Sequence, residues 1–377
     1  MSDTRANEII FMPLGGGQTI GASCYFLKLG NANILLDCGI GFKDGVPFAP
    51  NFHALLSSPY LQSPAQISQI FISHAHLDHA GWLSDFLMQS KSDAAVYMTD
   101  MTFLLIEHQI SMFHQKDYSV KRELLNSIVT RVSYMQQIPF GKCRATFYQA
   151  GHIPGAMMVL IEYRNRRILY TGDYSIASTP GTNGCRLPDG EIDLLILCGL
   201  HARHSSYRRS HDKLPYIIQK IKRALQHRRS VFYRVRQLSK GWELIKLLND
   251  HLNVPIYLDD SILKLIKRFE LKIIRVLEQN NYPLSAGRKL FPNVVLSMQP
   301  NFPFDPRYER LDEDFSLHDD FDDTVRFVKK INPKTAIVVH SPPPLGPFDE
   351  TIEQQLMNDA DCRTQFVFAN EGEAYVF

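Results

Sequence analysis

The segment His74-Ala75-His76-Leu77-Asp78-His79 holds three imidazoles and a carboxylate within six residues. The apolar stretch Ile70–Ser73 before it predicts a short strand, and in an extended segment alternate side chains point the same way. His74, His76 and Asp78 are therefore expected to converge, while His79 opens a helix and turns back toward the same cavity. Such a density of imidazole and carboxylate groups is typical of a site for zinc or a related divalent ion.

The amino-terminal half of the chain has the pattern of a strand-rich domain. Apolar runs separated by glycine-containing turns predict strands at Glu8–Pro13, Ser23–Leu29 and Asn33–Asp37. Apolar residues at helical spacing predict one long helix over Met101–Ile128. The apolar run Asp193–Cys198 predicts a strand that is buried on both faces.

The following segment is basic and has a different rhythm. Strands expected at Ser230–Val235 and Val254–Leu258 alternate with helices at Leu238–Leu252 and Asp259–Gln279, which predicts a small parallel α/β unit. Between Arg203 and Lys289 there are 20 Lys and Arg residues against 7 Asp and Glu, although the whole chain has a net charge of only +2. A polyanion partner is one interpretation of this charge, and a solvated basic surface without a ligand is the other.

Cysteine content and hydropathy restrict the compartment. The chain has six cysteines, none in a C-x-x-C pair, which indicates reduced thiols rather than a disulfide framework. Met1–Asn7 is polar and lacks the pattern of a secretion signal. No apolar stretch is long enough to span a bilayer. We therefore expect a cytoplasmic or nuclear protein with no membrane partner.

The histidine cluster and three later motifs resemble the metallo-β-lactamase superfamily. Asp37 lies in Leu-Leu-Asp-Cys-Gly, His152 in Ala-Gly-His-Ile-Pro-Gly-Ala, and Asp173 in Tyr-Thr-Gly-Asp-Tyr-Ser, in the order that the superfamily shows. The resemblance implies that His152 and Asp173 bind metal. It also implies that Asp37 orients the metal-binding loop without binding metal.

A closer resemblance is to the β-CASP nucleases within this superfamily. The opening Pro13–Gln18, followed by Ser23-Cys24, is similar to the start of that family, and Gly241–Leu244 is similar to its inserted domain. The implied fold is α/β: a metallo-β-lactamase αββα sandwich with an inserted, reduced β-CASP α/β domain. We expect the sandwich at 1–199 and 301–377, and the basic insertion at 200–300.

Two late histidines extend the resemblance, and one position departs from it. His318, in Phe-Ser-Leu-His-Asp-Asp, resembles the family's motif B, and His340, in Val-Val-His-Ser, resembles motif C of its RNA-processing branch. The family has an acid at the end of the strand after Asp173, where this chain has Cys198. The acid is thought to support the motif B histidine, so we expect a slower enzyme, a substitute such as His201 or Asp319, or a lost activity.

The resemblance implies a complete set of functional residues. Asp78 and His318 are the predicted catalytic residues, with His318 protonating the departing 3′ oxygen as a general acid. The basic charge between Arg203 and Lys289, and not the resemblance, suggests four nucleic-acid contacts, Arg208, Arg209, Arg228 and Arg229. Two zinc ions are expected, one held by His74, His76 and His152, the other by Asp78, His79 and His340, with Asp173 bridging.

These residues predict a dinuclear-zinc phosphodiesterase that hydrolyses RNA, most simply single-stranded RNA, with protein partners in a processing complex. Three alternatives stay open. One is a nuclease that prefers DNA, and another is a metal-binding but catalytically weak RNA-binding subunit, which Cys198 favours. The last is a hydrolase of a small ester, against which the basic insertion argues.

Overall fold

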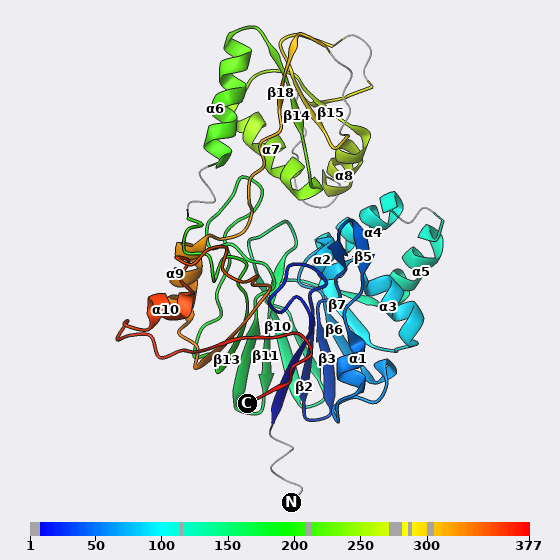
Figure 1. Ribbon diagram of the computed structural model, residues 1–377. Helices are drawn as coiled ribbons and strands as arrows, with labels where there is room; N and C mark the ends of the chain where they lie inside the picture. The colour runs from blue at the N-terminus through cyan, green and yellow to red at the C-terminus, as the bar shows by residue number, and fades with distance from the viewer. Residues whose placement is uncertain (1–7, 114–115, 209–212, 271–280, 286–288, 300–304) are drawn as a thin grey trace, which may run out of the picture. The chain divides into compact units, whose positions relative to one another are not determined.

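A computed structural model describes residues 8–113, 116–208, 213–270, 281–285, 289–299 and 305–377 (Figure 1). The chain divides into two compact units. The first unit comprises 1–177, 184–208 and 318–377, and the second comprises 178–183 and 209–317. The second unit thus extends to Leu317, beyond the predicted end of the insertion at residue 300, and also includes the short segment Ser178–Asn183. Glu243 explains the inclusion of this segment, because its carboxylate accepts hydrogen bonds from the Thr179 hydroxyl and the Gly181 N–H, at 2.8 and 2.7 Å.

The first unit is built on two seven-stranded sheets. The first sheet has the order β21-β1-β2-β3-β6-β7-β8, and the second has the order β20-β19-β13-β12-β11-β10-β9. The strands of the first sheet are β1 (Ile9–Gly15), β2 (Cys24–Leu29), β3 (Ala32–Leu36), β6 (Gln69–Phe71), β7 (Ala95–Thr99), β8 (Val129–Val132) and β21 (Tyr375–Val376). Those of the second sheet are β9 (Gln137–Phe140), β10 (Cys143–Gln149), β11 (Met157–Tyr163), β12 (Arg166–Tyr170), β13 (Leu194–Cys198), β19 (Thr335–Val339) and β20 (Gln365–Phe368). A further hairpin is formed by β4 (Gly41–Lys43) and β5 (Val46–Phe48).

The two sheets pack face to face over one apolar core. Alternate residues of the strands, such as Phe11 and Ile34 from the first sheet and Phe147 and Ile196 from the second, are buried in a single cluster. Burial of this alternating apolar face is the main force that holds a sandwich together. The core therefore fixes the strand ends from which the loops of the candidate site emerge.

Helices cover the outer faces of the sandwich, as Figure 1 shows for α3 to α5 beside the first sheet and for α9 and α10 beside the second. The helices of this unit are α1 (Phe52–Leu56), α2 (Leu77–Ala80), α3 (Leu83–Ser90), α4 (Asp100–Phe113), α5 (Tyr118–Ile128), α9 (Phe321–Ile331) and α10 (Ile352–Leu356), with a 3₁₀ turn at Pro64–Gln66. The single helix predicted over Met101–Ile128 is wrong, since α4 and α5 are separate helices that pack on each other. Glu107 of α4 accepts a hydrogen bond from Arg122 of α5 at 2.5 Å, across this packing.

The second unit is a five-stranded sheet with the order β16-β15-β17-β14-β18, in which every neighbouring pair is parallel. Its elements are α6 (Lys213–Gln226), β14 (Ser230–Arg234), α7 (Leu238–His251), β15 (Ile256–Leu258), α8 (Asp260–Glu270), β16 (Asn281–Pro283), β17 (Val294–Ser297) and β18 (Tyr308–Leu311). A parallel sheet with intervening helices confirms the predicted α/β insertion, and with the sandwich it confirms the predicted fold class. Val231, Val295 and Leu258 of these strands are fully buried, as is typical of parallel sheets.

Candidate metal centre

Asp37 anchors the loop that carries the histidine cluster. It follows β3 directly, is fully buried and has a positive φ of 61°. Its Oδ1 accepts the backbone N–H of Ser73 at 2.6 Å, and its Oδ2 accepts the Ser73 hydroxyl at 2.7 Å. Oδ2 also accepts the Tyr170 hydroxyl at 2.5 Å and lies 2.6 Å from Nδ1 of His79. Both oxygens are thus engaged by donors, and a carboxylate oxygen of Asp37 also lies within 4.8 Å of ligand atoms of His74 and His79.

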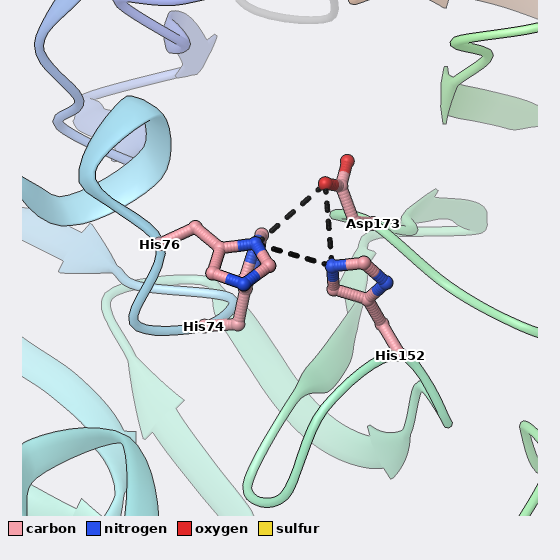
Figure 2. A group of neighbouring side chains, drawn as sticks. All are labelled: His74, His76, His152 and Asp173. Atoms are coloured by element: carbon pink, nitrogen blue, oxygen red, sulfur yellow. Dashed lines mark hydrogen bonds and ion pairs between the residues drawn. The ribbon is translucent and has the colours of Figure 1, made fainter. Parts of the chain in front are cut away.

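The first candidate group consists of His74, His76, His152 and Asp173, whose ligand atoms all lie within 4.8 Å of one another. Figure 2 shows the four side chains pointing toward one point from three separate loops. Nε2 of His74 and Nε2 of His152 lie 3.7 and 3.6 Å from Oδ2 of Asp173, and Nε2 of His152 lies 3.2 Å from Nδ1 of His76. Three imidazoles and a carboxylate at such spacing form a donor set that suits zinc.

The second candidate group consists of Asp78, His79 and His340, again within 4.8 Å of one another. Nε2 of His340 and Nε2 of His79 each lie 3.9 Å from Oδ2 of Asp78. Asp173 connects the two groups, because its Oδ1 lies 3.4 Å from Nε2 of His79 while its Oδ2 faces His74. The structure thus brings together the residues of each predicted ligand set and places Asp173 within 3.7 Å of both groups.

Asp78 does not converge with His74 and His76 as strand alternation predicted. Helix α2 begins at Leu77, so the extended segment ends at His76. Asp78 therefore points toward His79 and His340, and does not belong to the first group. Two backbone hydrogen bonds hold this turn, from Ser23 N to Asp78 O and from Cys38 N to His79 O, both 2.8 Å.

Neighbouring side chains set which imidazole nitrogen is available as a ligand. The Ser73 hydroxyl lies 3.0 Å from Nδ1 of His74 and already donates to Asp37, so it accepts from that nitrogen. Asp37 accepts from Nδ1 of His79 in the same way. The proton on Nδ1 leaves the Nε2 lone pairs of both rings directed into the centre, as a metal ligand requires. No sequence pattern indicates the role of Ser73, because serine is common at strand ends.

The glycine-rich turn Gly15–Gly17 positions His340. The N–H of His340 donates to Gly16 O at 2.6 Å, and the N–H of Ser341 donates to Gly17 O at 3.1 Å. Gly16 has a φ of +66°, and a Cβ at this residue would lie 2.8 Å from the Tyr25 hydroxyl, so only glycine fits. His340 itself has a φ of 51°, and its Nδ1 lies 3.0 Å from the Ser23 hydroxyl. The turn thus seats the last histidine of the second group.

Burial and the two aspartates perturb the imidazoles in opposite directions. Burial, followed by the charge of His152, lowers the pKa of His76 to about 3. Burial also lowers the pKa of His79, but Asp173, Asp37 and Asp78 outweigh it and raise the pKa to about 10. Burial would raise the pKa of Asp173, and His79 is the first of several histidines that hold it well below its usual range.

Three buried polar atoms at the centre lack hydrogen-bond partners in the described part of the chain, as expected of atoms that bind a cation. Nε2 of His74, Nε2 of His79 and Oδ2 of Asp173 are buried, and each lacks a hydrogen-bond partner among the residues that the structure describes. An unsatisfied buried donor or acceptor costs about 1–3 kcal/mol, so native proteins rarely leave three of them together. Coordination of a cation would satisfy all three, so these residues fit a metal ion.

His318 lies at the edge of the first group. Its Nδ1 is 3.5 Å from Oδ2 of Asp173, its ring centroid is 4.6 Å from that of His152, and its side chain is 24% exposed. Burial lowers the pKa of His318 well below its usual value, and Asp173 is the group that opposes this shift most. The imidazole therefore has access to solvent at the centre, and burial disfavours its protonated form.

Cys198 ends β13 beside this centre. Its N–H donates to the Thr171 hydroxyl at 3.0 Å, and its thiol donates to the Tyr170 hydroxyl at 3.8 Å. Burial raises the pKa of the thiol, and Asp173 and Asp37 raise it further.

The two predicted substitutes for the acid at 198 have contacts of their own. Both carboxylate oxygens of Asp319 accept the Ile176 N–H, at 2.9 and 3.1 Å. His201 stacks on Tyr207 at a centroid distance of 3.8 Å, and burial lowers its pKa to about 4.

The four predicted nucleic-acid contacts lie apart from these groups in the sequence. Arg208 is in the first unit and forms an ion pair with Asp322 at 2.5 Å. Arg228 and Arg229 are exposed residues of the second unit, and Nη1 of Arg229 lies 3.7 Å from Glu309. Arg209 lies outside the described residues.

None of the described helices combines the length and the apolar content that a membrane span needs.

Comparisons with known proteins agree with the motifs. The chain is 29% identical over 317 residues to the protein named probable RNase MJ4 of Methanocaldococcus jannaschii, an alignment that covers 76% of this chain and 70% of that protein. It is 27% identical to cleavage and polyadenylation specificity factor 73 of Drosophila melanogaster over 70% of this chain, and 28% identical to Integrator complex subunit 11 of Danio rerio over 66% of this chain. These alignments span 40% and 44% of the two longer relatives. The relatives are β-CASP nucleases, which confirms the resemblance.

A solved structure and a family model complete the comparison. A protein of unknown function from Enterococcus faecalis V583 aligns with a TM-score of 0.64 at 14% identity, covering 98% of this chain and all of that one, which supports the fold alone. The model of the metallo-beta-lactamase superfamily matches residues 18–216, more than half of the chain. This match includes the cluster at His74–His79, His152 and Asp173. The chain belongs to the metallo-beta-lactamase superfamily.

Proposed function

We propose that this chain is a dinuclear-zinc phosphodiesterase that hydrolyses single-stranded RNA. The observation that carries the proposal is the pair of ligand groups joined by Asp173, which lies 3.7 Å from His74 of the first group and 3.4 Å from His79 of the second. Two cations close together are the arrangement that phosphodiester hydrolysis uses. RNA as substrate is supported by the names of the relatives, and a polyanion is supported by the basic second unit.

Seven residues of the chain would bind the two zinc ions, and Asp37 would orient some of them. His74, His76 and His152 would hold one zinc ion, Asp78, His79 and His340 the other, and Asp173 would bridge. Zinc held there supplies Lewis acidity for activating water and phosphate oxygens at neutral pH. Asp37 holds the proton on Nδ1 of His79, which keeps Nε2 free to bind. Because Asp37 also fastens Ser73, one buried carboxylate aligns ligands of both groups.

His318 is the proposed general acid, which would protonate the 3′ oxygen as the phosphorus–oxygen bond breaks. This role is supported by the 24% exposure of its side chain and by the 3.5 Å distance from its Nδ1 to Oδ2 of Asp173. Arg208, Arg209, Arg228 and Arg229 are proposed to neutralise RNA phosphates, a role that would make affinity depend steeply on salt. The proposed enzyme would act with protein partners in an RNA-processing complex, in the nucleus or the cytoplasm.

A second candidate, a metal-binding RNA-binding subunit with weak catalysis, is favoured by one observation. With Cys198 in place of an acid, Asp173 is the main group that favours the protonated form of His318, and burial still lowers its pKa well below the usual value. A general acid that is mostly neutral at pH 7 protonates a leaving group poorly. The two candidates share the metal site and differ in the rate of cleavage.

The test combines metal analysis with cleavage of a labelled single-stranded RNA and of matched single-stranded DNA. We expect two zinc ions per chain and cleavage of RNA by the natural chain. The variant Asp78→Ala/His79→Ala should lose the zinc ion of the second group and should no longer cleave RNA. His53→Ala, a substitution of an exposed histidine in α1, is the matched control and should change neither. Zinc without cleavage would select the second candidate, DNA cleavage would select a DNA nuclease, and a chain that binds no metal would refute both proposals.

A further inference from the structure

The segment directly after His340 displays the most exposed large apolar side chains that the structure describes. Phe348 is 94% exposed, Leu345 81% and Met357 75%, and the next most exposed, Val46, is 65%. Single exposed apolar residues are ordinary, but several within a short stretch mark an interaction surface. These three lie within thirteen residues of one another, in the loop 342–348 and at the end of α10. We call them the apolar triad.

Hydrogen bonds hold the backbone of this loop in place. Asp349 accepts the N–H of Ser206 at 3.0 Å and the N–H of Leu345 at 3.2 Å, and Ile352 N donates to Ala202 O at 2.8 Å. The carbonyl of Pro343 lies 2.9 Å from Nε2 of His204. Four prolines further restrict the loop, at Pro342, Pro343, Pro344 and Pro347. A held loop loses little conformational entropy on binding, so the apolar triad is preorganised for a partner.

The charge around the apolar triad identifies the kind of partner. Residues 335–362 contain five Asp and Glu and no Lys or Arg, and one of the five, Asp359, pairs with Lys329 at 2.6 Å. Glu350 and Glu353 are exposed, and neither forms an ion pair with any residue in the described part of the chain. Carboxylates repel nucleic-acid phosphates and anionic lipid headgroups, so neither RNA nor a membrane surface fits here. A symmetric contact between two copies would also bring these like charges together.

We infer that the loop 342–348 and the end of α10 form a docking surface for a protein that presents an apolar pocket rimmed by Lys or Arg. Phe348 would enter the pocket, with Leu345 and Met357 beside it, while Glu350 and Glu353 would pair with the basic rim. A buried aromatic residue inside a polar rim is the usual composition of a binding hot spot. Because the loop begins one residue after Ser341, the partner would bind next to the second ligand group. This inference uses only the protein-partner part of the proposed function and does not depend on RNA cleavage.

The first step of the test places a photo-reactive benzoyl-phenylalanine at position 348 of the full chain in its native cells. A second chain carries the same group at Phe42, an exposed aromatic residue of the β4–β5 hairpin with 56% exposure, as the matched control. We expect one protein to crosslink at 348 and not at 42. RNA, lipid or a second copy of this chain crosslinked at 348, or equal products at both positions, would overturn the inference.

The second step measures the dissociation constant of the identified protein after purification. Phe348→Ser should weaken binding at least about thirtyfold, as for a buried aromatic anchor, and Phe42→Ser should leave it unchanged. Glu350→Lys/Glu353→Lys should also weaken binding, and exchange of the partner's rim cations for Glu should restore it. Thermal unfolding and zinc content show whether each variant is folded. Unchanged affinity in a folded Phe348→Ser chain would refute the docking surface whether or not the chain cleaves RNA.

Discussion

The substitution Asp37→Asn tests whether one buried carboxylate aligns the metal centre. Oδ2 of Asp37 accepts from the hydroxyls of Ser73 and Tyr170 and faces Nδ1 of His79, at 2.7, 2.5 and 2.6 Å. An amide group in place of Oδ2 would present two N–H donors to three groups that now donate. The two hydroxyls can rotate to accept, but His79 can accept only by moving its proton to Nε2. The variant therefore forces His79 into the tautomer that cannot bind metal, or leaves a buried donor unpaired.

The expected size of the effect follows from these contacts. Removing one partner of a buried charged pair costs about 3–5 kcal/mol, so the free energy of unfolding of the metal-free chain should fall by about that amount. Loss of a group that orients a metal-binding histidine lowers metal affinity about 10–100-fold. The second group, which contains His79, should lose more affinity than the first.

Urea unfolding of the metal-free chain and zinc titration against a competing chelator measure the two effects. The matched control is Asp193→Asn, at the opposite end of β13, where the carboxylate accepts from Lys334 and from the Arg167 N–H, at 2.7 and 2.8 Å. Because Lys334 is 64% exposed, solvent screens this pair, so Asp193→Asn should change stability far less than Asp37→Asn and should leave zinc affinity unchanged. If Asp37→Asn binds both zinc ions as tightly as the natural chain, the orienting role of Asp37 is wrong.

Three further predictions concern the second ligand group and the basic unit. His340→Ala should reduce the zinc content from two ions to one by elemental analysis, since it leaves all four members of the first group; a chain that keeps both ions would contradict the ligand assignment. Arg228→Glu/Arg229→Glu should weaken RNA binding and reduce the slope of log affinity against log salt by about 1.4, because each phosphate contact on a single strand contributes about 0.7. An unchanged slope would remove these arginines from the interface. In the metal-free chain the pKa of His79 is raised from 6.5 to about 10, so its stabilising effect is complete below pH 6.5 and is lost as pH rises toward 10. Urea unfolding between pH 7 and 10 should show falling stability, and an increase would refute this assignment.

The residues of the two candidate groups could be named from the sequence because they are close in sequence or lie in family motifs, whereas the groups that orient them could not. The segment His74–His79 holds three imidazoles and a carboxylate within six residues, which indicates a metal site by itself. The order of this segment, His152 and Asp173 indicated the superfamily. Ser73 and Tyr170, by contrast, act through contacts with Asp37 across 36 and 133 residues. Neither residue has a local pattern that distinguishes it from an ordinary strand residue, so only the packed sandwich brings them to the site.

The fold shows the same division between local and long-range causes. Hydrophobic alternation located most strands, and the change of rhythm after Arg203 located the α/β unit. Its extent differed because contacts distant in sequence determine it: Glu243 binds the segment at 179–181, more than sixty residues earlier. The split of Met101–Ile128 into α4 and α5 likewise depends on packing, through Glu107 and Arg122.

The consequence of Cys198 can be derived from its surroundings. The thiol donates to Tyr170, Tyr170 donates to Asp37, and Asp37 holds His79, so Cys198 ends a chain of hydrogen bonds that leads to the second ligand group. Burial, Asp173 and Asp37 keep this thiol neutral, whereas an acid at the same place would add a third buried negative charge to the centre. The contacts that align the candidate metal ligands are therefore present with Cys198 in this place, where no carboxylate favours protonated His318. In the proposed enzyme, replacement of the acid should accordingly affect the leaving-group step, whereas metal binding would depend on the candidate ligands, which are all present.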